Sequence, residues 1–266
     1  MTRVAVTGAA GRMGKTLVQA IHNADDLSLG AAFERADMSL IGSDAGELAG
    51  VGTLQVPVTS DIEASVDAFD VLIDFSVPAA TLPAVAACAA AGKPLVIGTT
   101  GFDADGLAAI HAAAERVSIM MAPNMSVGVN VSFKLIELAA RVLGDEVDVE
   151  VIEAHHRDKV DAPSGTAVRM GEILAATLDR DLAQDAIYGR QGITGPRERR
   201  TIGFETIRGG DIVGEHTVLF AGSGERIEIT HRAQSRMNFA VGALRAVRFV
   251  AQRPAGLFDM QDVLGL

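Results

Sequence analysis

Short apolar runs alternate with stretches of helical period through the first half of the 266-residue chain, and this alternation constrains the fold more than any other feature. The apolar runs are 3–7, 27–33, 71–75, 94–97 and 117–122, and the helical stretches are 11–24, 79–91 and 103–115. Strands that alternate with helices of this length form βαβ units, whose parallel sheet is covered by helices on both faces. The less regular segment 36–57 is predicted to hold loops or a short strand. We therefore expect an α/β fold.

The second half has a different pattern. The segment 126–143 has helical spacing with Ser126 as its cap, and in 146–154 the residues Val147, Val149 and Val151 share one face of a strand. Further strands are predicted at 201–207, 212–220 and 226–230, with glycine-rich turns between them, and a last helix at 239–251. Strands of this kind form an open, partly antiparallel sheet, whose polar face is either solvated or an oligomer surface.

Charge and cysteine content limit the partners. Lys and Arg number 23 against 34 Asp and Glu, so the net charge is −11 and the chain is a poor general binder of nucleic acid or anionic membranes. Anionic ligands must therefore meet local basic groups. The single cysteine, Cys88, excludes internal disulfides, and the sequence shows no apolar signal segment or membrane span. We expect a cytoplasmic protein.

A glycine-rich turn follows the first predicted strand and opens the first helix. It reads Gly8-Ala9-Ala10-Gly11-Arg12-Met13-Gly14, with Ala10 where a dinucleotide-binding fingerprint commonly has its middle glycine. Small residues at such a turn let the backbone approach a pyrophosphate, whose charge is then stabilised by N–H groups at the helix N-terminus. The context favours a Rossmann-like nucleotide domain over a purely structural tight turn.

Other residues that suit a dinucleotide lie at the ends of later strands. Glu34 suits a ribose hydroxyl and Arg35 a 2′-phosphate, with Arg12 as an assistant, which suggests that both NAD and NADP are accepted. Taken alone, Glu34 and Arg35 are better interpreted as an ordinary exposed ion pair. The segments 74–76, 98–101 and 122–125 also end strands, and are either turns or holders of the nicotinamide riboside.

The most distinctive segment is EAHHRDKVDAPSGTA, which spans residues 153–167 and joins a strand to a helix. His155, His156 and Lys159 combine groups that titrate near neutrality with a cation, which suits protonation of an anionic substrate. Ser164, Gly165 and Thr166 then form a carboxylate-binding nest at a helix N-terminus. The alternative to a catalytic role for the two histidines is that they lie in a solvent-exposed turn without a chemical function.

Several other groups are interpreted as structural. No third ligand stands at a suitable spacing from the histidine pair, which argues against a metal site. Cys88, without a nearby base, is predicted to be a buried inert thiol. The isolated histidines are predicted to lie on the surface or to be hydrogen-bonded in the core; they are His22, His111, His216 and His231. The arginines of 190–200 are read as a solvated loop, or alternatively as a mobile basic lid.

The full set of motifs resembles the 4-hydroxy-tetrahydrodipicolinate (dihydrodipicolinate) reductase family of bacterial lysine and diaminopimelate synthesis. The resemblance spans the chain and is carried by VAVTGAAGRMG, IGSDAGELAG, IDFS, VIGTTGF, NMSVGVN, EAHHRDKVDAPSGTA, GEHTVLF, ITHRAQSRMNFA and GLFDM. The segment EAHHRDKVDAPSGTA is the most specific of these motifs for the family. A mild departure is Met125, where some relatives carry phenylalanine, and it bears on the shape of the nicotinamide pocket.

The resemblance implies a dinucleotide-binding domain from 1–126 and 236–266, and a substrate-binding and tetramerisation domain from 127–235. It implies reduction of a cyclic dicarboxylate by NADPH or NADH, with loss of water, in a homotetramer. His155 is then the acid/base residue, Lys159 a proton donor or stabilising cation, and His156 with Ser164, Gly165 and Thr166 the substrate-binding set. The cofactor-binding residues implied are Gly8, Ala9, Ala10, Gly11, Arg12, Met13, Glu34, Arg35, Gly98, Thr99, Thr100, Ala122, Pro123, Asn124 and Met125.

Two other functions compete with this one. A two-domain sugar or polyol dehydrogenase would use the lysine of Lys93-Pro94 as its catalytic group. A non-catalytic NAD(P)H sensor would use the same fold to bind the cofactor without turnover, because a fold alone does not fix function.

Overall fold

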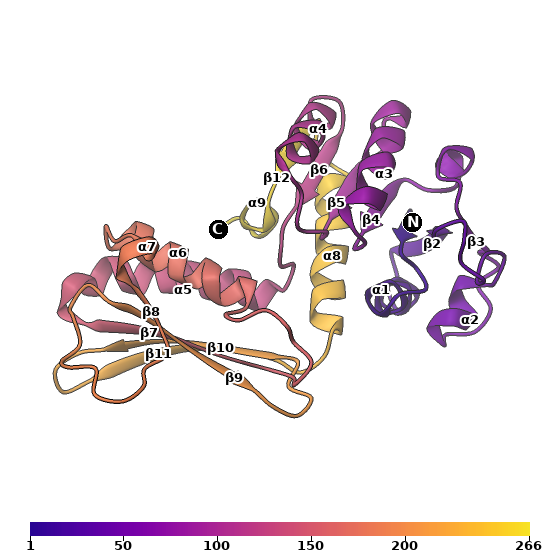
Figure 1. The fold of residues 1–266 in the computed structure, drawn as a ribbon. Coiled ribbons are helices and arrows are strands. Elements are labelled where there is room, and N and C mark those ends of the chain that lie inside the picture. Colours follow the sequence, from indigo (N-terminus) through magenta and orange to yellow (C-terminus); the bar gives the residue numbers. More distant parts are fainter. The chain divides into compact units, whose positions relative to one another are not determined.

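Two units make up the chain, and the computed structural model describes residues 1–266 (Figure 1). Unit 1 consists of residues 1–127 and 236–266, and unit 2 of residues 128–235. The C-terminal segment thus returns to the unit formed by the first half of the sequence.

Unit 1 is built on a seven-stranded sheet with strand order β12-β6-β5-β4-β1-β2-β3. All neighbouring strands are parallel. The strands are β1 (Thr2–Thr7), β2 (Leu27–Phe33), β3 (Val58–Thr59), β4 (Val71–Asp74), β5 (Leu95–Ile97), β6 (Ser118–Met121) and β12 (Gly256–Phe258). The chain leaves β1 toward β2 and later returns to β4 on the other side, so the strand order reverses between β1 and β4. Ligands of open α/β sheets bind beyond the carboxyl ends of the strands at such a point.

Helices cover both faces of this sheet because its strands are apolar on both faces. Val4 and Val6 of β1 pack in one core and Ala5 in the other. The first core includes α1 (Arg12–His22), α2 (Ala45–Ala49), α8 (Met237–Val250) and α9 (Met260–Leu264), and the second includes α3 (Pro78–Ala91) and α4 (Ala104–Ala114), with the 3-10 helix η1 (Glu63–Ala68) beside it. Because successive residues of each strand point into opposite cores and both cores are apolar, the strands are continuous apolar runs in the sequence.

Two details of unit 1 bear on the predictions. Cys88 is fully buried in α3 and burial raises the pKa of its thiol to about 12, so the prediction of an inert thiol is confirmed. The segment 36–57 holds a short helix, α2, where loops or a strand were expected. Asp44 explains the difference, because its carboxyl group caps α2 and also accepts hydrogen bonds from the backbone of Leu54 and Val56.

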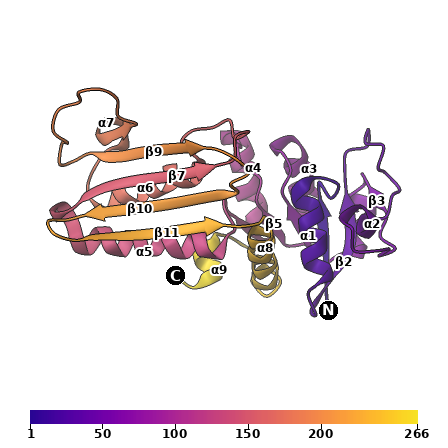
Figure 2. The ribbon, with the colours of Figure 1, turned by 90° about the horizontal axis from the view of Figure 1, so that it is seen from below.

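Unit 2 is a five-stranded mixed sheet with order β11-β10-β7-β9-β8. Its strands are β7 (Asp148–His155), β8 (Ala186–Tyr188), β9 (Ile202–Arg208), β10 (Gly214–Ala221) and β11 (Arg226–Ala233), and its helices are α5 (Val127–Leu143), α6 (Gly165–Thr177), α7 (Leu182–Asp185) and the 3-10 helix η2 (Gly144–Glu146). Residues of α5 and α6 share one core with the sheet, and Figure 2 shows both helices behind the strands. The opposite face carries no helix.

The fold class is therefore confirmed: a Rossmann-like parallel sheet plus an α+β part with an open mixed sheet. The short elements α7, α9, β8 and β12 were not predicted. No helix combines the length and the apolar character that a bilayer span requires.

Candidate active site

The glycine turn after β1 has a backbone that only small residues allow. Gly8 has a φ of +62°, and a Cβ on Gly14 would lie 2.1 Å from the Gly8 carbonyl oxygen. The carboxylate of Glu34, at the end of β2, accepts a hydrogen bond of 3.1 Å from the N–H of Ala10. No side chain caps α1 at Gly11, so the first N–H groups of α1 remain available to an anion. This cradle fits a pyrophosphate.

Asp74 organises the strand ends beside this turn. Its side chain is completely buried, and it accepts hydrogen bonds from the hydroxyls of Thr7 (2.7 Å) and Thr81 (2.8 Å). Further donors are the Thr99 hydroxyl and both the hydroxyl and the N–H of Ser76. One carboxyl group thus joins the carboxyl ends of β1 and β4 to the residue that follows Gly98 after β5. The sequence interpretation named Asp74 only within the segment 74–76, as part of a turn or of a nicotinamide riboside site, and did not predict this hydrogen-bonded cluster.

The remaining cofactor candidates of unit 1 differ in exposure. Arg12 and Arg35 are exposed, and Arg35 makes a 3.5 Å ion pair with Asp37 and a 3.9 Å contact with the sulfur of Met38, so both guanidinium groups remain accessible to a phosphate. Gly98 lies against the ring of Phe75, 2.3 Å from where a Cβ would be. Thr99 belongs to the Asp74 cluster, whereas Thr100 and Pro123 are exposed and Asn124 is half-buried.

Ala122 and Met125 are core residues. Both are buried, and Met125 is 1% exposed and packs in the first core of unit 1. Gly242 of α8 lies so close that a Cβ there would be 1.7 Å from the Met125 carbonyl oxygen. The methionine side chain therefore packs inward. Methionine in place of the phenylalanine of some relatives thus affects the packing of the core.

Lys93 lies at the wrong edge of the sheet for the competing polyol dehydrogenase. It precedes β5, whereas ligands bind beyond the carboxyl ends of the strands. Its ammonium group donates a 2.9 Å hydrogen bond to the carbonyl of Phe69 and lies over the ring of the same residue. A catalytic role for Lys93 is therefore excluded by this geometry.

In unit 2, His155 is paired with a buried carboxylate. Successive residues of β7 alternate in burial, and the buried face carries Val149, Val151, Glu153 and His155. The Nδ1 atom of His155 lies 2.6 Å from Oε2 of Glu153, which is 1% exposed. Arg208, at the end of β9, binds the same carboxylate through two nitrogens at 2.8 Å each, and the N–H of Ser164 adds a bond of 3.0 Å.

These contacts set the charges of the pair. Burial raises the pKa of Glu153, but the bonds from Arg208, His155 and Ser164 outweigh it and lower this pKa to about 2. Burial lowers the pKa of His155 below its ordinary value, with Lys159 and Arg208 in the same direction, although Glu153 opposes them. Since an ionised carboxylate only accepts hydrogen bonds, Nδ1 of His155 carries a proton and Nε2 is the atom that exchanges one.

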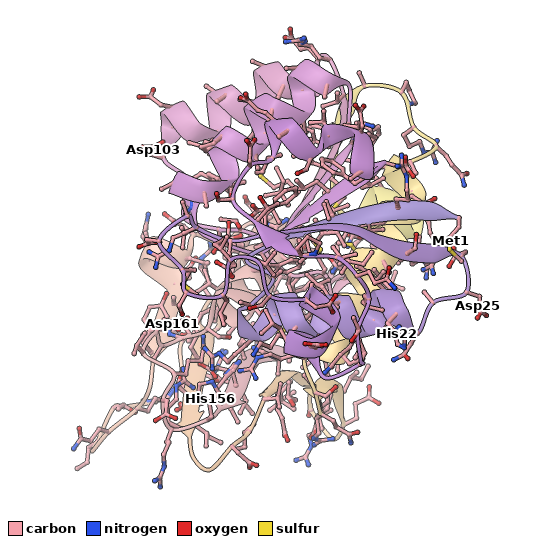
Figure 3. All side chains as sticks on the ribbon, turned by 90° about the vertical axis from the view of Figure 1, so that its right-hand side faces the viewer. Met1, His22, Asp25, Asp103, His156 and Asp161 are labelled. Atoms are coloured by element: carbon pink, nitrogen blue, oxygen red, sulfur yellow. The ribbon has the colours of Figure 1, made fainter.

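Lys159 is held by a carboxylate. Its ammonium group binds both oxygens of Asp161, at 2.7 and 2.8 Å, and its side chain is 20% exposed. Arg208 donates to the carbonyl of Asp161 at 2.7 Å, so the same arginine contacts the partners of both His155 and Lys159. His156 and Asp161, labelled in Figure 3, belong to this segment after β7, and His156 is half-buried.

Of the predicted carboxylate-binding residues 164–166, Ser164 already has hydrogen-bond partners within the protein. Ser164 caps α6 by accepting from the N–H of Ala167, and its hydroxyl is 2.8 Å from Nε2 of His216. His216, predicted to be a surface or hydrogen-bonded core residue, is buried 5.0 Å from the His155 ring, and burial lowers its pKa to about 3. Gly165 has open space where a Cβ would lie. Thr166 follows it in the first turn of α6 and is half-buried.

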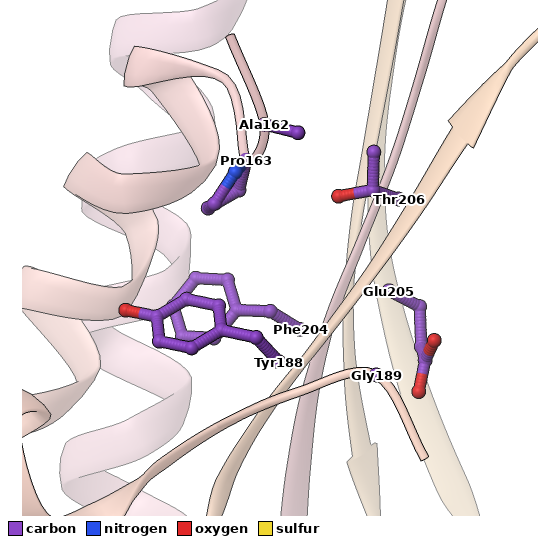
Figure 4. A pocket seen from close by; sticks show the side chains of 7 residues that line it. All are labelled: Ala162, Pro163, Tyr188, Gly189, Phe204, Glu205 and Thr206. Carbon is purple, nitrogen blue, oxygen red and sulfur yellow. The ribbon is translucent and has the colours of Figure 1, made fainter. Parts of the chain in front are cut away.

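A pocket of about 410 Å³ lies beside this network (Figure 4). Stacked rings of Tyr188 and Phe204 form one wall, with Glu205 and Thr206 nearby. Its lining also includes Pro163 but none of the predicted catalytic residues. The volume suits a small ligand, and the carboxylate of Glu205 forms a 3.5 Å ion pair with Arg190.

The arginines of 190–200 are not a free basic cluster. Arg190 and Arg197 both bind the carboxylate of Glu150, and Arg197 also binds Asp148. Arg199 donates to the carbonyl of Asp145, and Arg200 pairs with Asp185. The loop is therefore tied to the sheet and to its neighbours by ion pairs.

The sequence interpretation missed Glu153, Arg208 and His216 as members of the site. The signal was the two-residue period: Glu153 shares the apolar face of its strand with Val149 and Val151, as His216 does with Val218 and Phe220. A charged or ionisable group on the buried face of a strand needs a partner.

Comparisons with known proteins match the whole chain. The family model described as "Dihydrodipicolinate reductase, N-terminus" matches residues 2–125, and "Dihydrodipicolinate reductase, C-terminus" matches residues 128–264. A relative from Alkalilimnicola ehrlichii named 4-hydroxy-tetrahydrodipicolinate reductase is 60% identical over 265 residues, which cover 100% of this chain and 99% of the relative. A second relative named 4-hydroxy-tetrahydrodipicolinate reductase, from Pseudomonas fluorescens, is 60% identical over 267 residues. The alignment covers 100% of this chain and 100% of the relative.

A solved structure supports the same likeness. The dipicolinate-bound dihydrodipicolinate reductase from Paenisporosarcina sp. TG-14 has 26% sequence identity and a TM-score of 0.79, with 98% of each chain covered.

Proposed function

The chain belongs to the dihydrodipicolinate reductase family, and from this membership we infer that it is a 4-hydroxy-tetrahydrodipicolinate reductase of lysine biosynthesis. It reduces 4-hydroxy-tetrahydrodipicolinate to tetrahydrodipicolinate with loss of water, and takes the hydride from NADPH or NADH. The observation that carries this conclusion is the agreement of both family models with 60% identity over the full length.

The nicotinamide dinucleotide is assigned to unit 1. The glycine turn fits its pyrophosphate, since Gly8 and Gly14 bring the backbone close and the first turn of α1 has no side-chain cap. Glu34 suits a ribose hydroxyl, and the exposed Arg12 and Arg35 suit a 2′-phosphate, which is why both cofactors are proposed. The strand-end residues proposed to hold the remainder are Gly98, Thr99, Thr100, Ala122, Pro123, Asn124 and Met125. When bound, the cofactor supplies a hydride.

The acid of the reaction is assigned to His155. Hydride addition to a conjugated imine leaves an electron-rich intermediate that takes up one proton. Nδ1 of His155 is committed to Glu153, so Nε2 delivers that proton. Burial keeps the imidazole neutral without ligand, and the arrival of a dianion favours the imidazolium because an opposite charge raises its pKa.

The substrate carboxylates are assigned to the segment between β7 and α6. Gly165 leaves open space at the start of α6, whose first-turn N–H groups attract anions, and Thr166 follows it. Ser164 and His156 complete the proposed set. Lys159 offsets the charge of the dianion and of its reduced intermediate, and Asp161 positions its ammonium group until then.

We also assign to this family member a homotetrameric state and a cytoplasmic location. The uncovered face of the unit 2 sheet supports the first, because an open sheet face is a surface on which copies can pack. The buried free thiol of Cys88, in a chain without other cysteines, supports the second.

A coupled assay tests the proposed function. A dihydrodipicolinate synthase supplies the substrate from aspartate semialdehyde and pyruvate, and the absorbance of NADPH, then of NADH, is followed. We expect synthase-dependent oxidation of at least one cofactor, and none with a sugar polyol. Cofactor binding without any oxidation would instead indicate a nucleotide sensor and overturn the proposal.

A further inference from the structure

One residue of the segment 153–167, Glu153, has no part in the proposed chemistry, although it is a buried charged group. Glu153 is 1% exposed, and its two carboxylate oxygens are occupied by protein donors. Oε2 binds Nδ1 of His155 and one nitrogen of Arg208, and Oε1 binds the other nitrogen of Arg208 and the N–H of Ser164. No oxygen of Glu153 is left for a substrate, so any role must be exerted through its neighbours.

Those neighbours come from every element around the carboxylate. In the register of the sheet, His216 of β10 stands opposite Glu153, and Arg208 of β9 stands opposite His155. The groups that face His155 are therefore Glu153 on its own strand, Lys159 and Asp161 on the following segment, Arg208 on β9 and His216 on β10. Of these, only Glu153 bonds to the imidazole.

Resting on the proposed function, we propose that Glu153 is the positioning residue of His155, and that Arg208 holds Glu153 ionised for this task. The 2.6 Å bond fixes the Nδ1–H tautomer and the ring orientation, so that Nε2 always presents the exchangeable site. The bidentate Arg208 supplies the compensating charge that a buried carboxylate needs. Arg208 also binds the Asp161 carbonyl, which places the Lys159 segment in the same network.

The variant Glu153→Gln discriminates this role from mere packing. The amide keeps the shape but offers one acceptor oxygen to the donors of Arg208, Ser164 and His155, so its NH₂ group must face one of them. The nitrogen that can yield is Nδ1 of His155, which becomes an acceptor when the proton moves to Nε2. Glu153→Asp keeps the charge, and Glu150→Gln is the matched control, because Glu150 is an ion-paired glutamate on the other face of the same strand.

The experiment combines kinetics with ¹⁵N NMR of histidine-labelled enzyme, in which His155→Gln identifies the His155 signals. We expect Glu153→Gln to lower kcat about tenfold to hundredfold with the KM for NADPH within about twofold, and to move the proton of His155 to Nε2. A general acid works only when protonated, so kcat/KM falls as the pH rises through the pKa of His155. Removing the negative charge moves this fall to lower pH by about one unit.

Each variant has a decisive outcome. Glu150→Gln should leave kcat and the His155 signals unchanged, and Glu153→Asp should retain the Nδ1–H tautomer, including in the case that Glu153→Gln fails to fold. The proposal is overturned if Glu153→Gln retains the Nδ1–H tautomer or, should that variant fail to fold, if Glu153→Asp loses the Nδ1–H tautomer and still has wild-type kcat. A wild-type enzyme that fails in the coupled assay would refute the proposed function instead, while the NMR result would still decide the role of Glu153.

Discussion

Each unit contains a buried carboxyl group on a strand, Asp74 at the end of β4 and Glu153 within β7, and the two are satisfied in different ways. Asp74 in unit 1 accepts only from neutral donors, the hydroxyls of Thr7, Ser76, Thr81 and Thr99 and one N–H group. Glu153 in unit 2 accepts from the guanidinium of Arg208 and from an imidazole. Hydroxyls can donate without titrating, so the first cluster fixes a shape, whereas the second contains the imidazole of His155, which can gain and lose a proton.

The difference matches the two tasks proposed for the units. A pyrophosphate is held by backbone N–H groups on a precisely spaced turn, so the strand ends around it must stay in place. A proton donor must instead exchange its proton, and its environment must set its tautomer and pKa. Unit 1 thus contributes a rigid edge and unit 2 a titrating network.

Removing the proton donor should give the largest effect and separate the two tasks. We expect His155→Ala to lower kcat by about 10²- to 10⁴-fold, and Lys159→Ala to lower it strongly as well, because each removes a group assigned to the developing charge. Calorimetric titration with NADPH should give nearly wild-type affinity for both variants. His111→Ala, an exposed histidine on α4, serves as the control, and wild-type turnover in both test variants would refute the assignment.

The second effect concerns acid stability and the buried His216 of the titrating network. The pKa of His216 is about 3 in the folded chain, against an ordinary value of 6.5. The unfolded chain therefore binds a proton below pH 6.5 while the folded chain does not, so this contribution to stability is complete above pH 6.5 and is lost as the pH falls toward 3. Between pH 6.5 and 4.5 the loss is about 2 kcal/mol.

Urea unfolding of His216→Gln measures that loss. The glutamine amide does not titrate, so the free energy of unfolding of the variant should fall less than that of the wild type over the same pH range. His22→Gln, which replaces an exposed histidine, should follow the wild-type curve. Parallel curves for His216→Gln and wild type would show that His216 does not remain neutral in the folded protein.

The same contrast explains what the sequence could predict. The strands and helices of unit 1 follow from local patterns, because residues such as Val4, Ala5 and Val6 are all buried and read as one apolar run. The glycine turn is equally local. Short elements such as β8 and β12 depend on pairing with distant strands and have too few residues to show a period. The helix α2 depends on a cap that also binds residues beyond the helix.

The candidate catalytic network was harder to predict because it depends on strand register. His155 and Lys159 are close in sequence to each other, and their residue types indicate their chemistry. Arg208 is 55 residues from Glu153, and His216 is 52 residues from Ser164. Only the pairing of β7 with β9 and β10 brings these groups together, and a single sequence does not contain that register.

The smallest effect is expected at the rigid edge, from Asp74→Asn. The amide oxygen can replace Oδ1 and keep Thr81 and Thr99, while the NH₂ group faces the Thr7 hydroxyl, which can turn to the Ile73 carbonyl 3.3 Å away. Because the cluster can adapt, we expect NADPH to bind about threefold to tenfold more weakly, an effect of about 1 kcal/mol. The value of kcat at saturating cofactor should stay within about twofold, since His155 and Lys159 are unchanged.

Asp70→Asn is the matched control for this prediction. Asp70 precedes the same strand at its amino end, is partly exposed and pairs with Arg3, so its replacement should leave the affinity for NADPH unchanged. If Asp74→Asn lowered kcat and spared cofactor affinity, the neutral cluster would have to act on the chemical step, and the division between a rigid edge and a titrating network would be wrong. Equal losses of affinity in both variants would show that the sheet as a whole, and not the Asp74 cluster, sets the geometry of the cofactor edge.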